Sequence, residues 1–231
     1  MTSIQTDKLP DCNFSLIQDK NLFCYGTDAL LLAKFCLSPV NRIHDNDITV
    51  DLCTGNGIIP ILLAAKTKSK IYGVELQKES YNLAVKNVEL NNLQNQITIY
   101  NGDICEIEKF IPKNSATIVT ANPPYMKSSS SGIKENKNNA LNIARHEIKC
   151  RLSDVIKAAS LLLNSTGTFF MIHRPERLSE IFSELKKFNL EPKRMQFIFP
   201  SINKAPTMIL IESKKNAKPG IINMPPYVMY P

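Results

Sequence analysis

Short, β-branched apolar runs alternate along this chain with amphipathic runs of helical length. The short runs predict strands at residues 70–75, 96–100, 116–121 and 167–173, and residues 48–57 predict a further strand that runs into a glycine turn. The longer runs predict helices near residues 58–66, 79–91, 104–110, 151–163 and 176–188. Strands and helices that alternate in this way predict a parallel sheet with helices on both faces.

The two ends of the chain depart from this alternation. Residues 194–199 and 207–212 predict two strands whose connection is too short for a crossover helix, so they should pair antiparallel. Near the beginning, Thr27 or Asp28 is the predicted N-cap of a strongly apolar helix that reaches Cys36. We therefore expect an α/β fold of the Rossmann-like type, with about seven mostly parallel strands and a C-terminal antiparallel strand.

The chain should form one main domain with short additions at its ends. At 231 residues, 43% of them hydrophobic, it has ample material for a single core. We expect an N-terminal extension at residues 1–24, the α/β domain at 25–213 and a Pro-rich C-terminal tail at 214–231. Residues 126–139 lack apolar periodicity and predict a surface loop, which is either a lid over a substrate or a plain connection.

The predicted strand at 116–121 ends in the tetrapeptide Asn122-Pro123-Pro124-Tyr125. Two prolines cannot continue a hydrogen-bonded ladder, so the chain must turn outward there and expose Asn122 and Tyr125. The Asn side chain and a carbonyl next to a proline can accept hydrogen bonds from an amino group, and the Tyr ring offers a stacking face. The tetrapeptide therefore predicts a site for a planar aromatic amine.

A glycine turn upstream predicts a second binding element. Gly55 and Gly57 follow Asp51 at the end of a predicted strand, and glycine lets the backbone bend sharply and approach a ligand closely. A dinucleotide-binding fingerprint needs a third glycine three residues after Gly57, and Pro60 stands there instead. This departure argues against NAD as the ligand.

Carboxylates follow three predicted strands in turn, at Asp51, Glu75 and Asp103. The carboxyl ends of parallel strands meet at one edge of the sheet, where Glu75 could accept both hydroxyls of a ribose and Asp103 could bind the amino group of an adenine. A carboxylate beside the glycine turn repels phosphate and suits a cationic ligand. S-adenosylmethionine carries this charge and is the predicted cofactor.

Composition narrows the function classes further. No long apolar segment and no signal peptide is present, so we expect a soluble, cytoplasmic protein without a membrane partner. The six cysteines never form a Cys-x-x-Cys pair and only three histidines are present, so we expect no metal site. The net charge of +7 favours an acidic partner such as nucleic acid.

Together, these motifs resemble those of the class I amino-methyltransferases. Three further segments make the chain similar to the bacterial tRNA1(Val) adenine N6-methyltransferases, which modify the adenine 3′ of the anticodon. These segments are Gly26-Thr27-Asp28, Ala144-Arg145-His146-Glu147 and the run from Leu190 to Gln196. The likeness covers nearly the whole chain, from about Leu22 to Pro226.

The resemblance implies a role for each matching residue. The implied cofactor-binding residues are Tyr25, Gly26, Thr27, Asp28, Asp51, Cys53, Thr54, Gly55, Gly57, Glu75, Leu76, Asp103, Ile104 and Asn122. The implied catalytic residues, which would bind the N6 amine and stack on the base, are Asn122, Pro123, Pro124 and Tyr125. The candidate ligands for tRNA phosphates are Lys127, Lys134, Arg145, His146, Lys149, Arg151, Lys193 and Arg194. We expect a monomer, with a dimer as the alternative.

Other functions are compatible with the same motifs. Release-factor glutamine methyltransferases use a similar tetrapeptide on a side-chain amide, but they carry a helical domain ahead of the glycine motif, where this chain has only 47 residues before the first predicted strand. DNA adenine methyltransferases need a target-recognition domain, for which this chain has no spare length. Guanine methylation in rRNA and a catalytically silent, RNA-binding scaffold are the further alternatives.

Two segments have no part in the predicted site. A second Pro-Pro-Tyr at residues 225–227 follows Met224 instead of an Asn, and we interpret it as a decoy because no predicted strand leads into it. The first 20 or so residues, with Cys12 and Phe14, either complete the fold or help to seat RNA.

Overall fold

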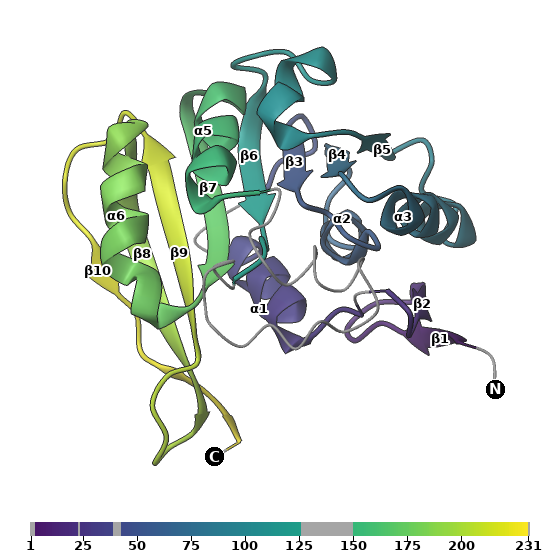
Figure 1. Cartoon of the computed structure of the whole chain (residues 1–231), viewed down its shortest axis with the longest axis horizontal. Helices are drawn as coiled ribbons and strands as arrows, with labels where there is room; N and C mark the ends of the chain where they lie inside the picture. Colours follow the sequence, from purple (N-terminus) through teal and green to yellow (C-terminus); the bar gives the residue numbers. More distant parts are fainter. Residues whose placement is uncertain (1–2, 23, 39–42, 126–149, 231) are drawn as a thin grey trace.

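The computed structural model describes residues 3–22, 24–38, 43–125 and 150–230. Its centre is a mixed sheet of nine strands with helices on both faces (Figure 1). The strand order is β10-β8-β9-β7-β6-β3-β4-β5, and β11 also pairs with β8.

Five parallel strands occupy the middle and one side of the sheet. They are β3 (Ile48–Leu52), β4 (Lys70–Glu75), β5 (Ile97–Asn101), β6 (Ala116–Ala121) and β7 (Leu163–His173). On the other side, β9 (Met208–Lys215) runs antiparallel both to β7 and to β8 (Leu190–Ser201). The predicted fold class is therefore confirmed, and so is the antiparallel pairing of the two strands near the C-terminus.

Helices cover both faces because the strands carry apolar residues on both sides. On one face lie α1 (Thr27–Cys36), α2 (Ile58–Ala64) and α3 (Lys78–Leu90); on the other lie η1 (Ile104–Lys109), α5 (Leu152–Leu162) and α6 (Leu178–Lys187), and η2 (Pro175–Arg177) leads into α6. Neighbouring strand residues alternate between the two cores: Ile118 belongs to the first and Val119 to the second.

The sheet grows in two directions from β3. The strands β4 and β5 are added on one side of it, whereas β6 and β7 are added on the other. Such a reversal leaves a crevice at the carboxyl ends of the two central strands, because the connections that leave them pass to opposite faces. The glycine turn follows β3 and the Asn-Pro-Pro-Tyr tetrapeptide follows β6, so both stand at this edge of the sheet.

The N-terminal extension forms a hairpin that completes the fold. Its strands β1 (Ile4–Lys8) and β2 (Ser15–Asp19) pair antiparallel, and Leu16 is fully buried in the core. The side chain of Asn87 on α3 accepts a hydrogen bond from the backbone N–H of Ile17 (2.7 Å) and donates one to its carbonyl (3.0 Å). The side-chain amide of Asn87 thus bonds both backbone groups of Ile17, as a neighbouring strand would, and attaches the hairpin to α3.

The C-terminal tail belongs to the sheet. β10 (Ile222–Asn223) and β11 (Tyr227–Tyr230) each pair parallel with β8, which raises the number of strands from the expected seven to nine. The expectation that no strand precedes the second Pro-Pro-Tyr is therefore wrong, because β10 ends one residue before Met224. Pro225 and Pro226 lie between β10 and β11 and interrupt the pairing with β8 at that point.

The start of α1 differs from the prediction. Gly26 is the N-cap residue and no side chain caps the helix, so neither Thr27 nor Asp28 is the N-cap. Asp28 is the second helical residue, and its Oδ1 accepts a hydrogen bond from the N–H of Ala29 (3.0 Å). A carboxylate in the first turn is favourable because the helix dipole is positive at this end.

Within the described residues, no helix is both long and apolar enough to cross a membrane.

Candidate active site

One cavity of about 420 Å³ opens at the carboxyl ends of β3, β4 and β6. It is lined by the glycine turn, by the ends of the neighbouring strands, by the start of α1 and by the Asn-Pro-Pro-Tyr corner. The lining residues are Tyr25, Asp28, Ala29, Cys53, Thr54, Gly55, Asn56, Ile58, Ile59, Val74, Glu75, Leu76, Gln77, Ser80, Asp103, Ile104, Asn122, Pro123, Pro124, Tyr125, Cys150 and Arg174. The two elements predicted to act together therefore face one space.

The glycine turn brings its backbone close to this space. Cys53 (φ 59°), Gly55 (φ 58°) and Gly57 (φ 84°) all have left-handed backbone conformations, which bend the chain sharply between β3 and α2. A Cβ built on Gly55 would meet no atom within 4 Å, so this glycine faces open space. Gly57 is different: a Cβ there would touch Ala84 of α3 at 3.4 Å, so this glycine serves helix packing and does not line the cavity.

Glu75 presents a buried carboxylate at the tip of β4. Its Oε2 accepts a hydrogen bond from the N–H of Gly55 (2.9 Å) and its Oε1 accepts one from the N–H of Gln77 (2.8 Å). Burial raises the pKa of Glu75, whereas these backbone N–H groups act in the opposite direction. Each carboxylate oxygen has a further lone pair, so this residue can accept two hydroxyl groups of a ligand in the cavity.

Asp51 supports the turn from behind and does not line the cavity. It is fully buried, and its two oxygens accept hydrogen bonds from the hydroxyls of Thr54 and Thr120, both at 2.6 Å. Burial raises its pKa to about 7, although both hydroxyl bonds lower it. The structure thus places this predicted cofactor ligand as a brace between the glycine turn and β6.

Two apolar side chains and one acidic side chain that follow β4 and β5 also line the cavity. Leu76 and Ile104 supply apolar walls, and Asp103 supplies a half-buried carboxylate between β5 and η1. The Oδ1 of Asp103 accepts the N–H of Cys105 (2.8 Å), which fixes the side chain at the start of η1. All three are among the residues for which the resemblance implies contact with the cofactor.

The Asn-Pro-Pro-Tyr corner closes the opposite end of the cavity. Asn122 and Tyr125 are half-buried, and both reach the start of α1: Asn122 Nδ2 donates to Asp28 Oδ2 (3.2 Å), and the Tyr125 hydroxyl donates to the same oxygen (2.8 Å). The Tyr125 hydroxyl also lies within hydrogen-bond reach of Asn122 Oδ1. Pro123 and Pro124 line the cavity beside them.

Tyr125 is flanked by two residues from the end of β7. The ring of His173 meets the Tyr125 ring edge to face, with 5.3 Å between centroids and 79° between planes. The guanidinium carbon of Arg174 lies 5.4 Å from the centre of the same ring, and Arg174 Nη1 donates to the carbonyl of Thr207 (3.0 Å). Burial lowers the pKa of His173 to about 3, so this imidazole is neutral at physiological pH.

Several lining residues were missed by the sequence analysis. They are Ala29, Asn56, Ile58, Ile59, Val74, Gln77, Ser80, Cys150 and Arg174. Arg174 directly follows the strand predicted at 167–173, so the rule that found Glu75 and Asp103 at strand ends could have found it too. Cys150 had no signal: its sulfur lies 3.7 Å from that of Cys53, a contact across 97 residues of sequence.

The predicted residues around the start of α1 are only partly at the cavity. Tyr25 and Asp28 line it, whereas Gly26 and Thr27 are exposed and do not. Among the described residues, no group of three or more His, Cys, Asp or Glu side chains could hold a metal ion.

Three of the eight predicted RNA ligands lie within the described residues. Lys127, Lys134, Arg145, His146 and Lys149 lie outside the described residues, as does the loop predicted at 126–139. Arg151 is exposed at the start of α5, and Lys193 is half-buried with its Nζ donating to the carbonyl of Lys218 (3.1 Å).

The prediction for Arg194 is wrong. Its side chain is only 7% exposed, it forms an ion pair with the buried Glu212, and its guanidinium carbon lies 5.0 Å from the ring centre of Phe35. A cation that neutralises a buried carboxylate in the core is not available to a phosphate.

Comparison with known proteins agrees with this geometry. A model of the TRM5/TYW2 methyltransferase domain matches residues 39–126, which run from just before β3 to just after Tyr125. A protein of Flavobacterium psychrophilum named tRNA1(Val) (adenine(37)-N6)-methyltransferase is 24% identical over 213 residues, covering 90% of this chain and 87% of the relative. A protein of Histophilus somni with the same name is 30% identical over 161 residues, covering 69% and 64%.

Over most of its length the chain is thus similar to tRNA1(Val) (adenine(37)-N6)-methyltransferases.

Solved methyltransferase structures share the fold of this chain. A predicted O-methyltransferase, protein Atu636 from Agrobacterium tumefaciens, has a TM-score of 0.68 at 21% identity and covers 87% of both chains. The structure of P. horikoshii TYW2 in complex with MeSAdo has a TM-score of 0.64 at 14% identity and covers 94% of this chain and 73% of that chain. At these identities both likenesses concern the fold alone.

Substitution of Asp51 by Asn should weaken the pH dependence of this methyltransferase's stability. The pKa of Asp51 is about 7 in the folded protein against an ordinary value of 3.8, so folding takes up a proton between these values. The contribution of Asp51 is therefore fully present below about pH 4, falls as the pH rises and is lost above about pH 7. Asn keeps the shape of Asp without titrating, so Asp51→Asn should lose less stability over this range.

Urea unfolding of both proteins at pH 5 and pH 7.5 measures this difference. The pKa of Glu75 is raised as well, so the variant should still lose some stability between pH 5 and pH 7.5, although less than the wild-type protein. An equal loss of stability in the two proteins would show that Asp51 is already ionised at pH 5.

Proposed function

We propose that this protein transfers a methyl group from S-adenosylmethionine to the exocyclic N6 amine of an adenine in tRNA. The target is an anticodon-loop adenine, namely the one 3′ of the anticodon in tRNA1(Val). The observation that carries the proposal is that one cavity joins the acid-bearing strand tips Glu75 and Asp103 to the Asn122–Tyr125 corner. A donor and an acceptor that share such a space can meet without a large movement of the protein.

The residues at one end of the cavity fit S-adenosylmethionine. When bound, this cofactor supplies an electrophilic methyl group on a sulfonium centre. Glu75 would accept the ribose hydroxyls, Asp103 would accept the adenine amine, and Leu76 and Ile104 would cover the adenine faces. The open space at Gly55, where a Cβ would meet nothing, leaves room for the ligand against the turn.

Asn122 and Pro123 would hold the target amine at the other end. The lone pair of an adenine amine is spread into the ring, so the amine is a weak nucleophile. Hydrogen bonds from its two N–H groups to Asn122 Oδ1 and the Pro123 carbonyl would draw the nitrogen toward a tetrahedral geometry and direct its lone pair at the donor. Alignment of this kind contributes several kcal/mol to catalysis. As the new N–C bond formed, the methyl–sulfur bond would break and S-adenosylhomocysteine would leave, after which the methylated nitrogen would lose a proton to water.

The target adenine would stack on the ring of Tyr125 once it has been extracted from the stacked bases of the RNA. Extracting a base costs a few kcal/mol, and stacking on an aromatic ring offsets roughly 1–3 kcal/mol of this. A loop nucleotide is easier to extract than one in a duplex, which favours an anticodon-loop target.

Arg174 supports an RNA substrate. It is exposed at the mouth of the cavity, stands over the Tyr125 ring and is held there by the Thr207 carbonyl. A guanidinium beside the position of the extracted base can bind the phosphate of that nucleotide. The names of the relatives, which specify tRNA, point to the same class of substrate.

A substrate panel tests the proposed function. Purified protein with labelled S-adenosylmethionine should transfer label to unmodified tRNA1(Val), and hydrolysis of the product should yield N6-methyladenosine. rRNA fragments, DNA and release factor should remain unlabelled. Label in the release factor alone would replace the RNA substrate with a glutamine side chain, and label on guanine in rRNA would replace the base.

Substitution of Asn122 by Ala should reduce the turnover number by about 100-fold or more, because the transition state loses an acceptor for the reacting amine. The dissociation constant for S-adenosylhomocysteine, measured by calorimetry, should change by no more than about threefold. The matched control is Tyr227→Ala in the second Pro-Pro-Tyr, which lies outside the cavity and should leave turnover near the wild-type value. Equal losses of cofactor affinity and turnover in Asn122→Ala would assign Asn122 to the cofactor instead.

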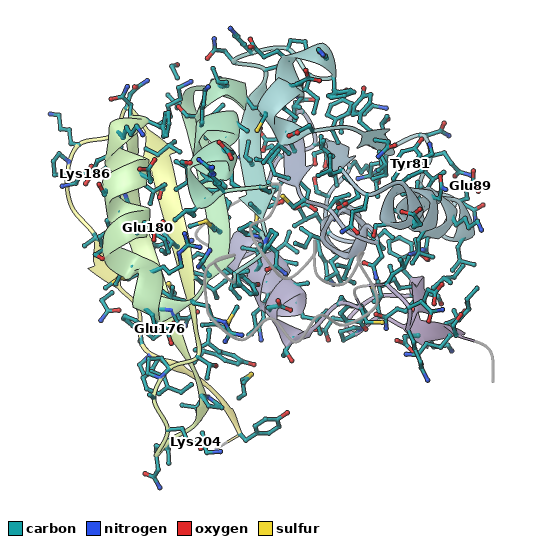
Figure 2. The ribbon with its side chains drawn as sticks, viewed as in Figure 1. Tyr81, Glu89, Glu176, Glu180, Lys186 and Lys204 are labelled. Carbon is teal, nitrogen blue, oxygen red and sulfur yellow. The ribbon has the colours of Figure 1, made fainter. Side chains whose placement is uncertain are left out.

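Substitution of Arg174 by Ala should raise KM for tRNA. If the guanidinium binds one phosphate, the slope of log affinity against log salt should also become shallower by about one unit. Filter binding of tRNA between 50 and 200 mM salt measures this. Lys186→Ala is the control, because Lys186 is exposed on α6, away from the start of η2 (Figure 2). An unchanged salt slope in Arg174→Ala would exclude the phosphate contact.

A further inference from the structure

Asp28 joins the start of α1 to the acceptor end of the cavity. Its Oδ1 accepts the N–H of Ala29 (3.0 Å), and its Oδ2 receives both Asn122 Nδ2 (3.2 Å) and the Tyr125 hydroxyl (2.8 Å). Both oxygens of this carboxylate are therefore engaged, and the two side chains that meet Oδ2 are the two polar members of the tetrapeptide. They are separated from Asp28 by more than 90 residues of sequence.

The position of the Asp28 carboxylate is fixed by the helix that carries it. α1 has ten residues and is anchored in the core by Ala29, Leu32 and Phe35, each no more than 4% exposed. The positive end of the helix dipole also favours a negative charge in the first turn. A carboxylate carried by a helix that is anchored in the core thus stands beside the Asn122–Tyr125 corner.

An Asn that binds an amine has two orientations with opposite effects. With Oδ1 toward the amine it accepts a hydrogen bond, whereas with Nδ2 toward the amine it places donor against donor. An ionised carboxylate only accepts, so Asp28 can pair with the Nδ2 side of Asn122 and with no other. The contact between Asp28 and Asn122 therefore selects the productive orientation.

The Tyr125 hydroxyl competes with the target amine for Asn122 Oδ1, and Asp28 offers this hydroxyl another acceptor. The Tyr125 hydroxyl has one proton and lies within reach of both Asp28 Oδ2 and Asn122 Oδ1. A charge-assisted bond to a carboxylate is stronger than a bond to an amide oxygen, so the proton belongs with Asp28. Asn122 Oδ1 is then left free for the target amine. Burial and the charge of Asp28 both raise the pKa of Tyr125, which keeps this hydroxyl protonated.

We propose that Asp28 is a positioning residue that orients Asn122 and keeps its Oδ1 free of the Tyr125 hydroxyl. The inference rests on the proposed function, because it concerns how the target amine is received. It differs from the expectation that Asp28 serves the cofactor site.

Asp28→Asn is the most direct test, because it preserves shape while adding donors and removing the charge. Asn122 should then sample both orientations, and the turnover number for tRNA should fall by about 10- to 100-fold. The dissociation constant for S-adenosylhomocysteine should change by no more than about twofold. The matched control is Glu89→Gln, another loss of one carboxylate, at an exposed position on α3 outside the cavity (Figure 2). A loss of cofactor affinity as large as the loss of turnover would overturn the proposal.

A double-mutant cycle separates a positioning role from an independent one. If Asp28 acts through Asn122, adding Asp28→Asn to Asn122→Ala should reduce turnover by less than about twofold further. If the two losses multiply, Asp28 acts elsewhere and the proposal fails.

A measurement without substrate distinguishes this proposal from the proposed function. The side-chain amide signal of Asn122 in a 15N–1H spectrum is identified by its absence from Asn122→Ala. It should shift in Asp28→Asn and stay in place in Glu89→Gln, while the backbone signals show that the variants are folded. A signal unmoved by Asp28→Asn would overturn the positioning role even if tRNA is the substrate. A shift in a protein that does not methylate tRNA would retain the positioning role and reject the proposed function.

Discussion

One buried carboxylate connects the two halves of the site. Asp51 accepts hydroxyl hydrogen bonds from Thr54, in the glycine turn, and from Thr120, which precedes Asn122 by two residues on β6. A buried carboxylate without such partners would cost several kcal/mol, so the pair of threonines and the Asp stabilise one another as a unit. This unit links the glycine turn to the strand that leads into the Asn-Pro-Pro-Tyr corner, and under the proposed function methyl transfer depends on the distance between these two elements.

Around this brace the site is assembled from strand ends that are distant in sequence. The reversal of strand order at β3 opens the crevice, the prolines after β6 turn the chain out at its edge, and Gly55 brings the backbone of the turn up to Glu75. The rigid sheet supplies the positions, whereas short segments beyond the strands supply the chemistry. In this way a fold shared with other methyltransferases can carry an acceptor corner of its own.

The basic character of the chain divides into structural and functional parts. Arg194 forms an ion pair with the buried Glu212 next to the Phe35 ring, and Lys215 donates to two carbonyl oxygens and one amide oxygen near the beginning of β6 and β7. Arg174, by contrast, is exposed beside Tyr125 at the mouth of the cavity. A net charge therefore indicates a class of partner, but the burial of each cation decides which of them can meet that partner.

The sequence by itself determined the elements and most of the cavity wall. Hydrophobic periodicity predicted β3, β4 and β6 nearly residue for residue, because this property depends on local pattern. The rule that parallel strands end at one edge placed Glu75, Asp103 and Asn122 together, because this property depends on sheet topology.

Only the tertiary structure decided which side chains face the cavity. It set Asp51 behind the turn, buried Arg194, drew the C-terminal tail into the sheet, and brought Asp28 and Arg174 to Tyr125. These outcomes depend on burial and on contacts between segments that are apart in sequence, by 97 residues for Asp28 and Tyr125, and such contacts leave no periodic trace in the sequence.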